Sequence, residues 1–563
     1  MTVTDTPPEA PEAPEAADAE EPAPEVRPWP PATDHKVVGT VFVVVAILSL
    51  VAAGLIALVM RAQLSSADMD VVGRVTYGEL FTLHGTLAVF GFLAPVWVGL
   101  ATAVVPLQIG ASRLAFPRLQ ALCLWVVVGG ITMIATSPFV KSGDVVSGWS
   151  LSSPIPEGPA FRGNGHDLLI LGVGLVAVAL VLASANLVVT VIKMRAPGLT
   201  LRRTPLFSWS VLVAGAVILL ALPVLIAGLG MLFMDRHYGA HIFRGFTGSL
   251  GGNPNIWPRL FWFAAYPLLW ALLLPALGAV SDIVATFSRR RLFSHLRAAA
   301  AIGAVGVLAF AGWGSETPGL SRARLLFATG ALLVLAPVAS LVLNWLATLL
   351  MGRREKKTGP RTVGALPMVV AAGFVTVLAV GLGGGAVAAL TTGTSSHRNY
   401  WQVATQHTLF FGAGTLGFVA ALAYWGPKLW GRHLSDKGGK LAAVLLVGGM
   451  HLTFLPMFVL GAQNMRVHLF TYESGDDFGP ANLVATVGAV VTVLGVAVLA
   501  LDLLVSVIAR KGRQADDDPW QGHTLEWATS SPPPSHNFDR LPEVRSEAPL
   551  LDLRDAGAAE AVP

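Results

Sequence analysis

The sequence predicts an all-α integral membrane protein of about twelve transmembrane helices. Charged residues make up only 13% of the 563 residues and hydrophobic residues 54%, whereas a soluble chain averages about 25% charged residues. The mean hydropathy is +0.64. From Val37 onward, apolar runs of about twenty residues or more recur, and each is long enough to cross a bilayer as a helix.

The apolar runs follow one another with short polar connections. The predicted spans are 37–60, 80–109, 118–138, 167–192, 206–234, 258–287, 295–313, 323–352, 364–392, 400–426, 440–463 and 480–509. The segment before them, residues 1–34, is rich in Pro, Glu and Ala and lacks the basic start and apolar centre of a signal peptide. We therefore expect a disordered acidic tail over 1–34, a transmembrane domain over 35–510 and a C-terminal tail over 511–563.

Basic residues are concentrated on alternate connections. This set comprises Arg113, Arg118, Lys193, Arg195, Arg202, Arg203, Arg289, Arg290, Arg291, Arg353, Arg354, Lys356, Lys357, Lys428, Arg432, Lys437, Arg510, Lys511 and Arg513. The opposite connections, including 141–162 and 235–256, are sparser in Lys and Arg. The bias predicts that the first set is cytoplasmic, which places both termini inside. The formal net charge of +4 gives no indication of nucleic-acid binding, and the lone Cys123 excludes an intrachain disulfide.

Two histidines interrupt apolar runs, and an ionisable residue inside a membrane is by default a candidate functional site. His84 lies about four residues into the second span and His407 about seven into the tenth, so the two have similar depth at 1.5 Å rise per residue. Two neutral imidazoles on neighbouring helices can bind one heme iron from opposite faces. Each histidine alone is equally compatible with a hydrogen-bonded core residue, which is the role we expect for His451.

Several motifs stand in a fixed order along the chain. They include Val105-Pro-Leu-Gln-Ile-Gly-Ala, Thr204-Pro-Leu-Phe-Ser-Trp-Ser-Val, Asn344-Trp-Leu-Ala-Thr-Leu and Thr524-Leu-Glu-Trp-Ala-Thr-Ser-Ser-Pro-Pro-Pro. Together with the two histidine segments, this set resembles subunit I of the heme-copper oxidases, the cytochrome c oxidase family. The resemblance is collinear over roughly residues 34–540, and the tail is similar to actinobacterial members, which implies a bacterial plasma membrane protein.

The resemblance implies roles for five residues. The family histidines that correspond to His84 and His407 are the axial ligands of its low-spin heme. Trp149 and His397 match external-loop positions near the heme propionates, on the side where electrons arrive. Arg466 stands where the family has a pair of arginines that neutralise the propionates. The resemblance also implies partners besides the lipid bilayer, namely other oxidase subunits such as II and III, and cytochrome c.

The sequence departs from the family on the sixth and seventh helices, which carry its copper site. The family motif His-Pro-Glu-Val-Tyr is replaced by Tyr266-Pro-Leu268-Leu-Trp270. The copper histidine, the proton-gating glutamate and the linked tyrosine are thereby lost. The family motif Trp-Ala-His-His is replaced by Phe-Ala-Gly312-Trp313, which removes both remaining copper ligands.

Other positions needed for oxygen reduction and proton transfer are also replaced. Thr405 stands at the position of the high-spin heme ligand and has no nitrogen to offer an iron. Arg113 and Thr102 replace the aspartate and asparagine of one proton channel, and Leu341 replaces the lysine of the other. Besides His84 and His407, His451 is the one histidine away from the ends of the predicted spans, so we expect one low-spin heme of unknown type and no copper.

Three functions are compatible with this pattern. The first is a membrane cytochrome with one bis-histidine heme, used for electron transfer or structure in a respiratory complex without its own oxygen-reducing centre. The second is a working cytochrome c oxidase subunit I that couples oxygen reduction to proton pumping. The third is a heme-free scaffold or assembly subunit. Because function depends on the site and not on the fold, the retained histidines and lost ligands favour the first, and enzymatic activity stays open.

Overall fold

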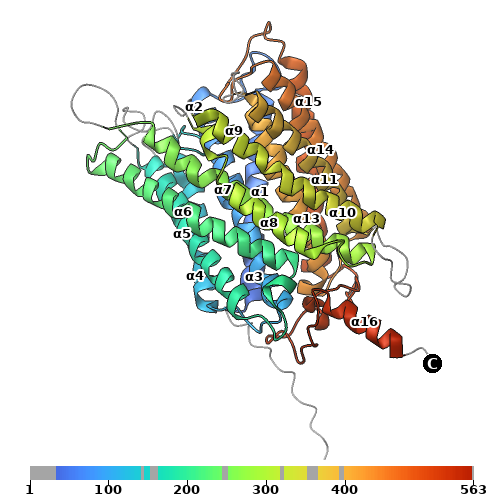
Figure 1. Ribbon diagram of the computed structural model, residues 1–563. Helices are drawn as coiled ribbons and strands as arrows, with labels where there is room; N and C mark the ends of the chain where they lie inside the picture. Colours follow the sequence, from blue (N-terminus) through green and yellow to red (C-terminus); the bar gives the residue numbers. More distant parts are fainter. Residues whose placement is uncertain are drawn as a thin grey trace, which may run out of the picture.

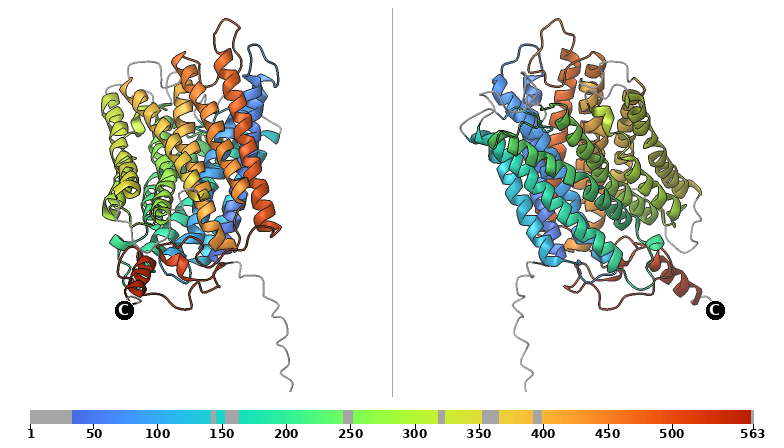
Figure 2. Two further views of the ribbon diagram at one scale, coloured as in Figure 1. Left: turned by 90° about the vertical axis from the view of Figure 1, so that its right-hand side faces the viewer. Right: turned by 60° about the vertical axis from the view of Figure 1, so that its left-hand side comes forward.

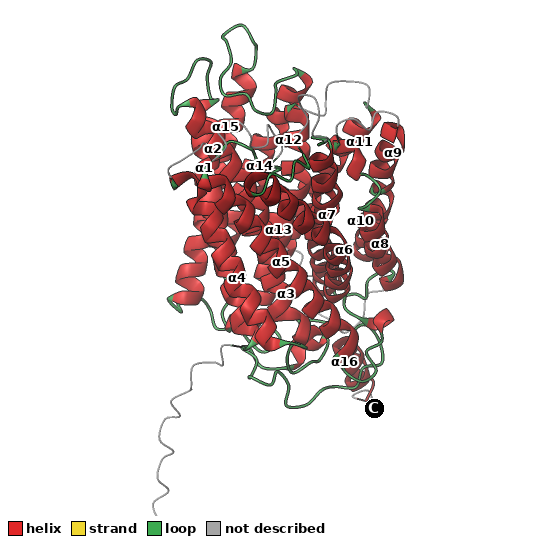
Figure 3. Cartoon of the chain, turned by 90° about the vertical axis from the view of Figure 1, so that its left-hand side faces the viewer, coloured by secondary structure: helices red, strands yellow, loops and turns green. Residues whose placement is uncertain are grey.

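The chain forms a bundle of long, roughly parallel helices (Figures 1 and 3). The computed structural model describes residues 33–140, 145–151, 163–243, 252–317, 323–351, 365–391 and 399–560. In these residues, twelve helical spans are long and apolar enough to cross a membrane. Extended pairing in the same residues is limited to two isolated bridges. The predicted all-α architecture with about twelve spans is therefore confirmed.

The twelve spans alternate in direction along the chain. They are α1 (His35–Gln63); α2 (Arg74–Thr86), η1 (Leu87–Leu93) and α3 (Ala94–Gln108); α4 (Pro117–Thr136) and η2 (Ser137–Phe139); α5 (Asn164–Lys193); α6 (Leu206–His237); α7 (Ile256–Ser288); α8 (His295–Leu308) and η5 (Trp313–Glu316); α9 (Arg324–Leu333) and α10 (Leu335–Met351); α11 (Leu366–Leu390); α12 (Tyr400–Gln406), η8 (His407–Gly412) and α13 (Ala413–Trp430); α14 (Asp436–Ala462); and α15 (Gly479–Leu503) and η9 (Leu504–Ile508).

Three of these spans form the centre of the bundle. In the most apolar 18-residue stretches of Arg74–Gln108, Ile256–Ser288 and Tyr400–Trp430, the buried fractions are 94%, 89% and 94%. In Gly479–Ile508 the corresponding fraction is only 22%, so this span lies at the periphery with most of its side chains facing outward. The second and tenth spans, which carry His84 and His407, are thus enclosed by the other helices.

Several helices begin earlier than the apolar pattern predicts, because their first turns are polar. The second span begins at Arg74 rather than near residue 80, which places His84 about three turns from the helix start rather than about one. His35, His166 and His295 lie in the first turns of α1, α5 and α8. An expectation that the spans contain only His84, His407 and His451 is therefore wrong: earlier helix starts add His35 and His166, and His295 is the first residue of α8 as it is of the predicted span.

The eighth span is interrupted between α9 and α10. Helix α9 ends at Leu333 and α10 begins at Leu335. Pro337 follows two residues later and has no N–H to donate to the carbonyl of Leu333, four residues before it. The proline therefore accounts for the break.

The C-terminal segment, which includes η10 (Leu525–Ala528) and α16 (Pro549–Glu560), covers one end of the bundle (Figure 2). The Lys428 ammonium donates to the carbonyls of Asp517, Thr529 and Ser530 at 2.7, 2.5 and 3.3 Å. Asn537 lies within hydrogen-bond distance of His35, in the first turn of α1, at 2.9 Å. The described C-terminal segment and the start of α1 therefore lie at the same end, where the basic connections also gather.

Candidate functional site

His84 and His407 meet inside the bundle. The Nε2 atoms of the two rings are 3.5 Å apart, although the residues are 323 positions apart in the chain. The ring centroids are 5.8 Å apart and the ring planes are within 8° of parallel. The structure therefore brings together the two histidines that the sequence singled out.

Each imidazole is oriented by a backbone carbonyl. His84 Nδ1 lies 3.0 Å from the carbonyl of Ala53 on α1, and His407 Nδ1 lies 2.8 Å from that of Val403 on its own helix. A carbonyl only accepts, so each Nδ1 carries the hydrogen, and in a neutral ring Nε2 then has the free lone pair. This is how ligating histidines are usually held.

Two lone pairs that face each other repel, and a metal ion between them removes the repulsion. Two metal–imidazole bonds of about 2 Å each require about 4 Å between the nitrogens, close to the 3.5 Å observed. The donor set and its geometry therefore fit a metal bound from both sides.

Two apolar cavities border the histidine pair. One has a volume of about 270 Å³ and reaches α1, α14 and α15, and the other has about 130 Å³ and reaches Trp149 and Leu269. Both histidines line both cavities, so the pair stands where the two meet. A flat apolar group such as a porphyrin, set between the imidazoles, would extend into both.

Arg61 is a site residue that the sequence did not single out. It lies in the last turn of α1, is only 5% exposed and lines the larger cavity. Its Nη2 donates to the backbone and side-chain oxygens of Asn482 at 3.1 and 2.6 Å, while Nε meets no acceptor in the described part of the chain. A basic residue at the end of an apolar run normally extends to the membrane surface, so no sequence signal distinguishes this buried arginine.

Trp149 packs against the helix that carries His84. It lines the smaller cavity and makes edge-on contacts with Phe261 and Trp262, at centroid distances of 5.1 and 5.8 Å. A Cβ added at Gly85 would lie 2.9 Å from the Cβ of Trp149. The glycine next to His84 therefore allows this close approach.

Of the other two residues expected near the propionates, the structure describes Arg466 but not His397. The backbone of Arg466 forms an isolated bridge with Asn399, its side chain is exposed, and the adjacent Val467 lines both cavities. Arg466 is thus at the outer edge of the site. His397 lies outside the described residues.

Both histidine-bearing spans contain a π-helical segment next to the histidine. Segment η1 begins three residues after His84, and η8 begins at His407 itself. A π-helical turn inserts one extra residue into the α-helical register and is frequent at functional sites. In a span buried on all sides, no amphipathic periodicity reveals the shift, so the π-helical turns could not be predicted from the residues.

A third cavity, of about 80 Å³, gathers positions to which the resemblance assigns a copper ligand, the high-spin heme ligand and the linked tyrosine. Tyr266, Trp270 and Thr405 all line it. Gly312 is adjacent, because a Cβ there would lie 2.6 Å from the Tyr266 hydroxyl oxygen. The neighbouring Trp313 packs against Phe263 and Phe327 at 5.6 and 5.2 Å, and Leu268 is fully buried.

The lining of this third cavity contains no His, Cys, Asp or Glu. Throughout the described ranges, no three or more such side chains form a group that could hold a metal ion. Thr405 Oγ1 and Trp270 Nε1 are shielded from solvent and have no hydrogen-bond partner in the described structure. Polar atoms thus line the cavity without forming a metal-binding set.

The other singled-out positions lie apart from the histidine pair. His451 Nδ1 donates to the carbonyl of Val447 at 2.8 Å, and His451 lines none of the three cavities. Leu341 is buried on α10, and Arg113 is exposed in the connection after α3. Thr102 is buried and accepts a hydrogen bond from the Gln120 side chain at 2.7 Å.

Known proteins resemble this chain over almost its whole length. Residues 37–491 match the family model described as "Cytochrome C and Quinol oxidase polypeptide I". A probable cytochrome c oxidase subunit 1-alpha of Streptomyces coelicolor is 35% identical over 531 residues, covering 93% of this chain and 89% of that protein. Cytochrome c oxidase subunit 1 of Bacillus subtilis is 34% identical, covering 94% and 83%. Quinol oxidase subunit 1 of the same organism is 32% identical, covering 94% and 80%.

A solved structure shares the fold. A chain of a heme-copper terminal oxidase dimer superimposes with a TM-score of 0.66 at 18% identity, covering 93% of this chain and 88% of that one. The helical spans, the sequence relatives and this fold agree. The chain therefore belongs to the subunit I family of the cytochrome c and quinol oxidases, the membrane-spanning heme-copper oxidase subunits of respiratory electron transport.

Proposed function

We propose that this chain is a membrane cytochrome that holds one low-spin heme between His84 and His407. It serves electron transfer or structure in a respiratory oxidase complex and has no oxygen-reducing centre of its own. The observation that carries the proposal is the pair of Nε2 atoms facing each other at 3.5 Å while both Nδ1 atoms donate to carbonyls. Among the described residues, this arrangement presents two imidazole nitrogens to a metal, and no group of three or more metal-binding side chains accompanies them.

The surrounding residues have separate tasks in this proposal. A bound heme supplies one-electron oxidation and reduction, at a potential set by its axial ligands and burial. Arg61 would donate from the larger cavity to a polar group on the porphyrin edge. Trp149 and Gly85 fix the His84 helix. Arg466 and, by the resemblance alone, His397 would serve the propionates.

The proposed lack of oxygen reduction rests on the third cavity. Its lining offers aromatic rings, hydroxyls, amides and aliphatic groups, but no imidazole or carboxylate. A proton relay across hydrocarbon requires titratable groups or water, and Leu268 and Leu341 provide hydrocarbon at two positions where the family has titratable residues. These replacements support a heme-binding subunit in which the oxygen chemistry has been lost.

The proposal also covers the setting of the chain. We place it in a bacterial plasma membrane with both termini cytoplasmic, beside other oxidase subunits such as II and III. Residues 1–34 form an acidic tail, 35–510 the transmembrane heme-binding domain and 511–563 a cytoplasmic tail. Cytochrome c is the proposed electron donor, and the quinol oxidase relative makes quinol the alternative to test.

Optical spectroscopy of the purified chain tests the proposal. A reduced-minus-oxidised spectrum should show one low-spin heme, and adding carbon monoxide to the reduced protein should not change it. A heme that reacts with carbon monoxide would instead indicate an oxygen-binding centre and an active oxidase. A protein without any heme would favour the scaffold function.

Substitution of the ligands tests the assignment of the residues. His84→Ala and His407→Ala should each abolish the low-spin signal, because a single imidazole cannot make the iron six-coordinate. His451→Ala is the matched control and should retain the signal, since His451 lines none of the three cavities. Retention of an unchanged low-spin spectrum in either of the first two variants would refute the assignment.

A further inference from the structure

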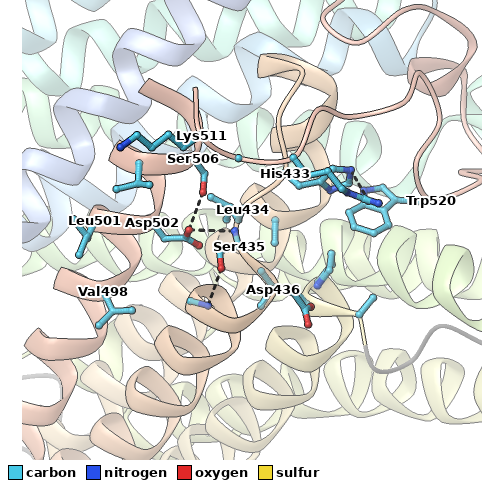
Figure 4. A pocket seen from close by; sticks show the side chains of 18 residues that line it. His433, Leu434, Ser435, Asp436, Val498, Leu501, Asp502, Ser506, Lys511 and Trp520 are labelled. Carbon is cyan, nitrogen blue, oxygen red and sulfur yellow. Dashed lines mark hydrogen bonds between the residues drawn. The ribbon is translucent and has the colours of Figure 1, made fainter. Parts of the chain in front are cut away.

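A large cavity, unrelated to the histidine pair, opens at the end of the bundle that the C-terminal segment covers. Figure 4 shows side chains that line it, and its volume is about 750 Å³. It lies between the first residues of α11 and α14 and the end of α15, and residues 511–513 and Trp520 close its other side. None of the residues assigned to the heme site lines it.

The lining of this cavity includes one buried carboxylate, that of Asp502, which is 8% exposed. One oxygen, Oδ1, accepts from the backbone N–H of Ser435 at 3.1 Å and from the Ser506 hydroxyl at 2.9 Å (Figure 4). The other oxygen, Oδ2, is shielded from solvent and meets no donor in the described part of the chain. A buried charged oxygen without a donor raises the free energy of the folded state. A ligand with an N–H or O–H group that bonds to this oxygen would therefore bind favourably.

The rim of the cavity has the opposite charge. Lys511 and Arg513 line it and their side chains are exposed. The Arg513 guanidinium donates to His433 Nε2 at 3.2 Å, and among the described residues no carboxylate forms an ion pair with either cation. The other carboxylate of the lining, Asp436, is already paired with Lys440 at 2.8 Å. The rim can therefore bind an anion above the single deep carboxylate.

The third wall is apolar and belongs to the most peripheral span. Val498, Leu501 and Val505 of the twelfth span line the cavity, and Leu501 and Val505 are 59% and 39% exposed. Because this span is mostly exposed, the wall continues onto the bilayer-facing surface. A hydrocarbon chain could run from the cavity along it.

We propose that this cavity binds a phospholipid whose headgroup carries a primary ammonium, as in phosphatidylethanolamine. The ammonium donates to Asp502 Oδ2, the phosphate lies between Lys511 and Arg513, and an acyl chain runs along Leu501 and Val505. Basic pockets between helices at the cytoplasmic side of membranes commonly bind lipid phosphates. The unpartnered carboxylate oxygen adds selectivity for a headgroup with N–H donors.

Native mass spectrometry of the full chain tests this selectivity. The protein is freed of lipid in detergent and titrated with phosphatidylethanolamine or phosphatidylcholine that carry identical acyl chains. Both headgroups have a phosphate and a positive charge, but the trimethylammonium of phosphatidylcholine has no N–H. Since a hydrogen bond to a charged group is worth at least a factor of about ten, phosphatidylethanolamine should bind about tenfold more tightly.

Variants assign the preference to this cavity. Asp502→Asn should bring the two affinities together, because an amide NH2 replaces the acceptor oxygen. Asp436→Asn is the matched control and should keep the preference. Lys511→Gln and Arg513→Gln should weaken both lipids equally. The two rim variants keep the test decisive if Asp502→Asn fails to fold, which size-exclusion chromatography reports.

Several results would overturn the proposal. Equal binding of the two lipids by the native chain would mean that Asp502 Oδ2 receives no hydrogen bond from the headgroup. An unchanged preference in a folded Asp502→Asn protein, or unchanged lipid affinity in both rim variants, would place the lipid elsewhere. Displacement of the lipid by millimolar inorganic phosphate would indicate a site for free anions, whereas we expect none because the apolar wall contributes to lipid binding.

Discussion

His84 and His407 owe their alignment to two carbonyl groups rather than to neighbouring side chains. The sequence identified both imidazoles, because an unbroken apolar run makes a histidine conspicuous, and it placed them at similar depth. It could not identify their anchors, since every residue has a carbonyl and Ala53 and Val403 look like any other apolar residues. It also missed Arg61, whose burial depends on how α1 packs. The two candidate ligands could thus be predicted from the sequence, whereas the carbonyl groups that orient them and the buried Arg61 could not.

The Thr405 hydroxyl lowers the stability of the fold when no polar group occupies the third cavity, because it is buried without a hydrogen-bond partner among the described residues. Thr405→Val keeps the shape and removes a shielded oxygen without a partner, so it should raise the free energy of unfolding by about 1 kcal/mol. Thr408→Val, three residues later, removes a hydroxyl that donates to the carbonyl of Ala404 at 2.6 Å and should not stabilise. Thermal unfolding in detergent compares the two. Destabilisation by Thr405→Val would mean that the hydroxyl forms a hydrogen bond with a polar group bound in the third cavity, as expected if an oxygen-reducing centre were present there.

Among the elements, the helices were the most predictable and their internal irregularities the least. The apolar runs located all twelve spans, because only long apolar runs can cross a bilayer. Apart from the start of the second span, the predicted boundaries lie within about four residues of those in the structure. Pro337 explains the break in the eighth span. The π-helical segments η1 and η8 were not predictable, because a register shift inside a fully buried helix leaves the apolar pattern unchanged.

Glu526 and His523 are buried titratable groups of the C-terminal segment. They have opposite effects on how pH changes the docking of this segment against the helix bundle. Burial raises the pKa of the Glu526 carboxyl, whose Oε1 accepts from Gln108 and Trp425 at 3.1 and 3.0 Å. Burial, together with Arg554 and other nearby arginines, lowers the pKa of His523 from 6.5 to about 3. As the pH falls below 6.5, the undocked segment gains a proton at His523 that the docked one resists, so His523 weakens docking. Glu526 acts in the opposite sense, because the docked carboxyl binds a proton more readily than the undocked one.

Two variants should separate these effects. In Glu526→Gln the contribution of Glu526 is removed and that of His523 stays, so lowering the pH from 7 to 5 should loosen the segment more than it does in the native chain. In His523→Gln the contribution of His523 is removed and that of Glu526 stays, so the same change should hold the segment more tightly than it does in the native chain. Hydrogen exchange of residues 523–552, corrected for the intrinsic effect of pH, compares the two variants with the native chain. If both variants change the native pH response in the same direction, one of the two pKa shifts has been assigned the wrong sign.

For the whole molecule, the distribution of basic residues over the two ends predicts the orientation in the membrane. Cys123 is buried, at 1% exposure, so Cys123→Ser provides a background without reactive thiols. In that background, Ser474→Cys between α14 and α15 should react with a membrane-impermeant maleimide in intact cells. Lys437→Cys, exposed at the opposite end, should react only after lysis. The reverse labelling pattern would place both termini outside.

The separation of His84 and His407 along the chain has a consequence for biosynthesis. Helices emerge from the ribosome in order, and the second span is complete long before the tenth has been made. A heme clamped by both histidines therefore cannot be inserted until synthesis has passed residue 407, and it then ties α1 and α2 to the helix of His407. Heme supply would therefore control a late step of assembly. In chains that lack heme, the early and late helices would not be held together by the two histidines, and membrane proteases could degrade them.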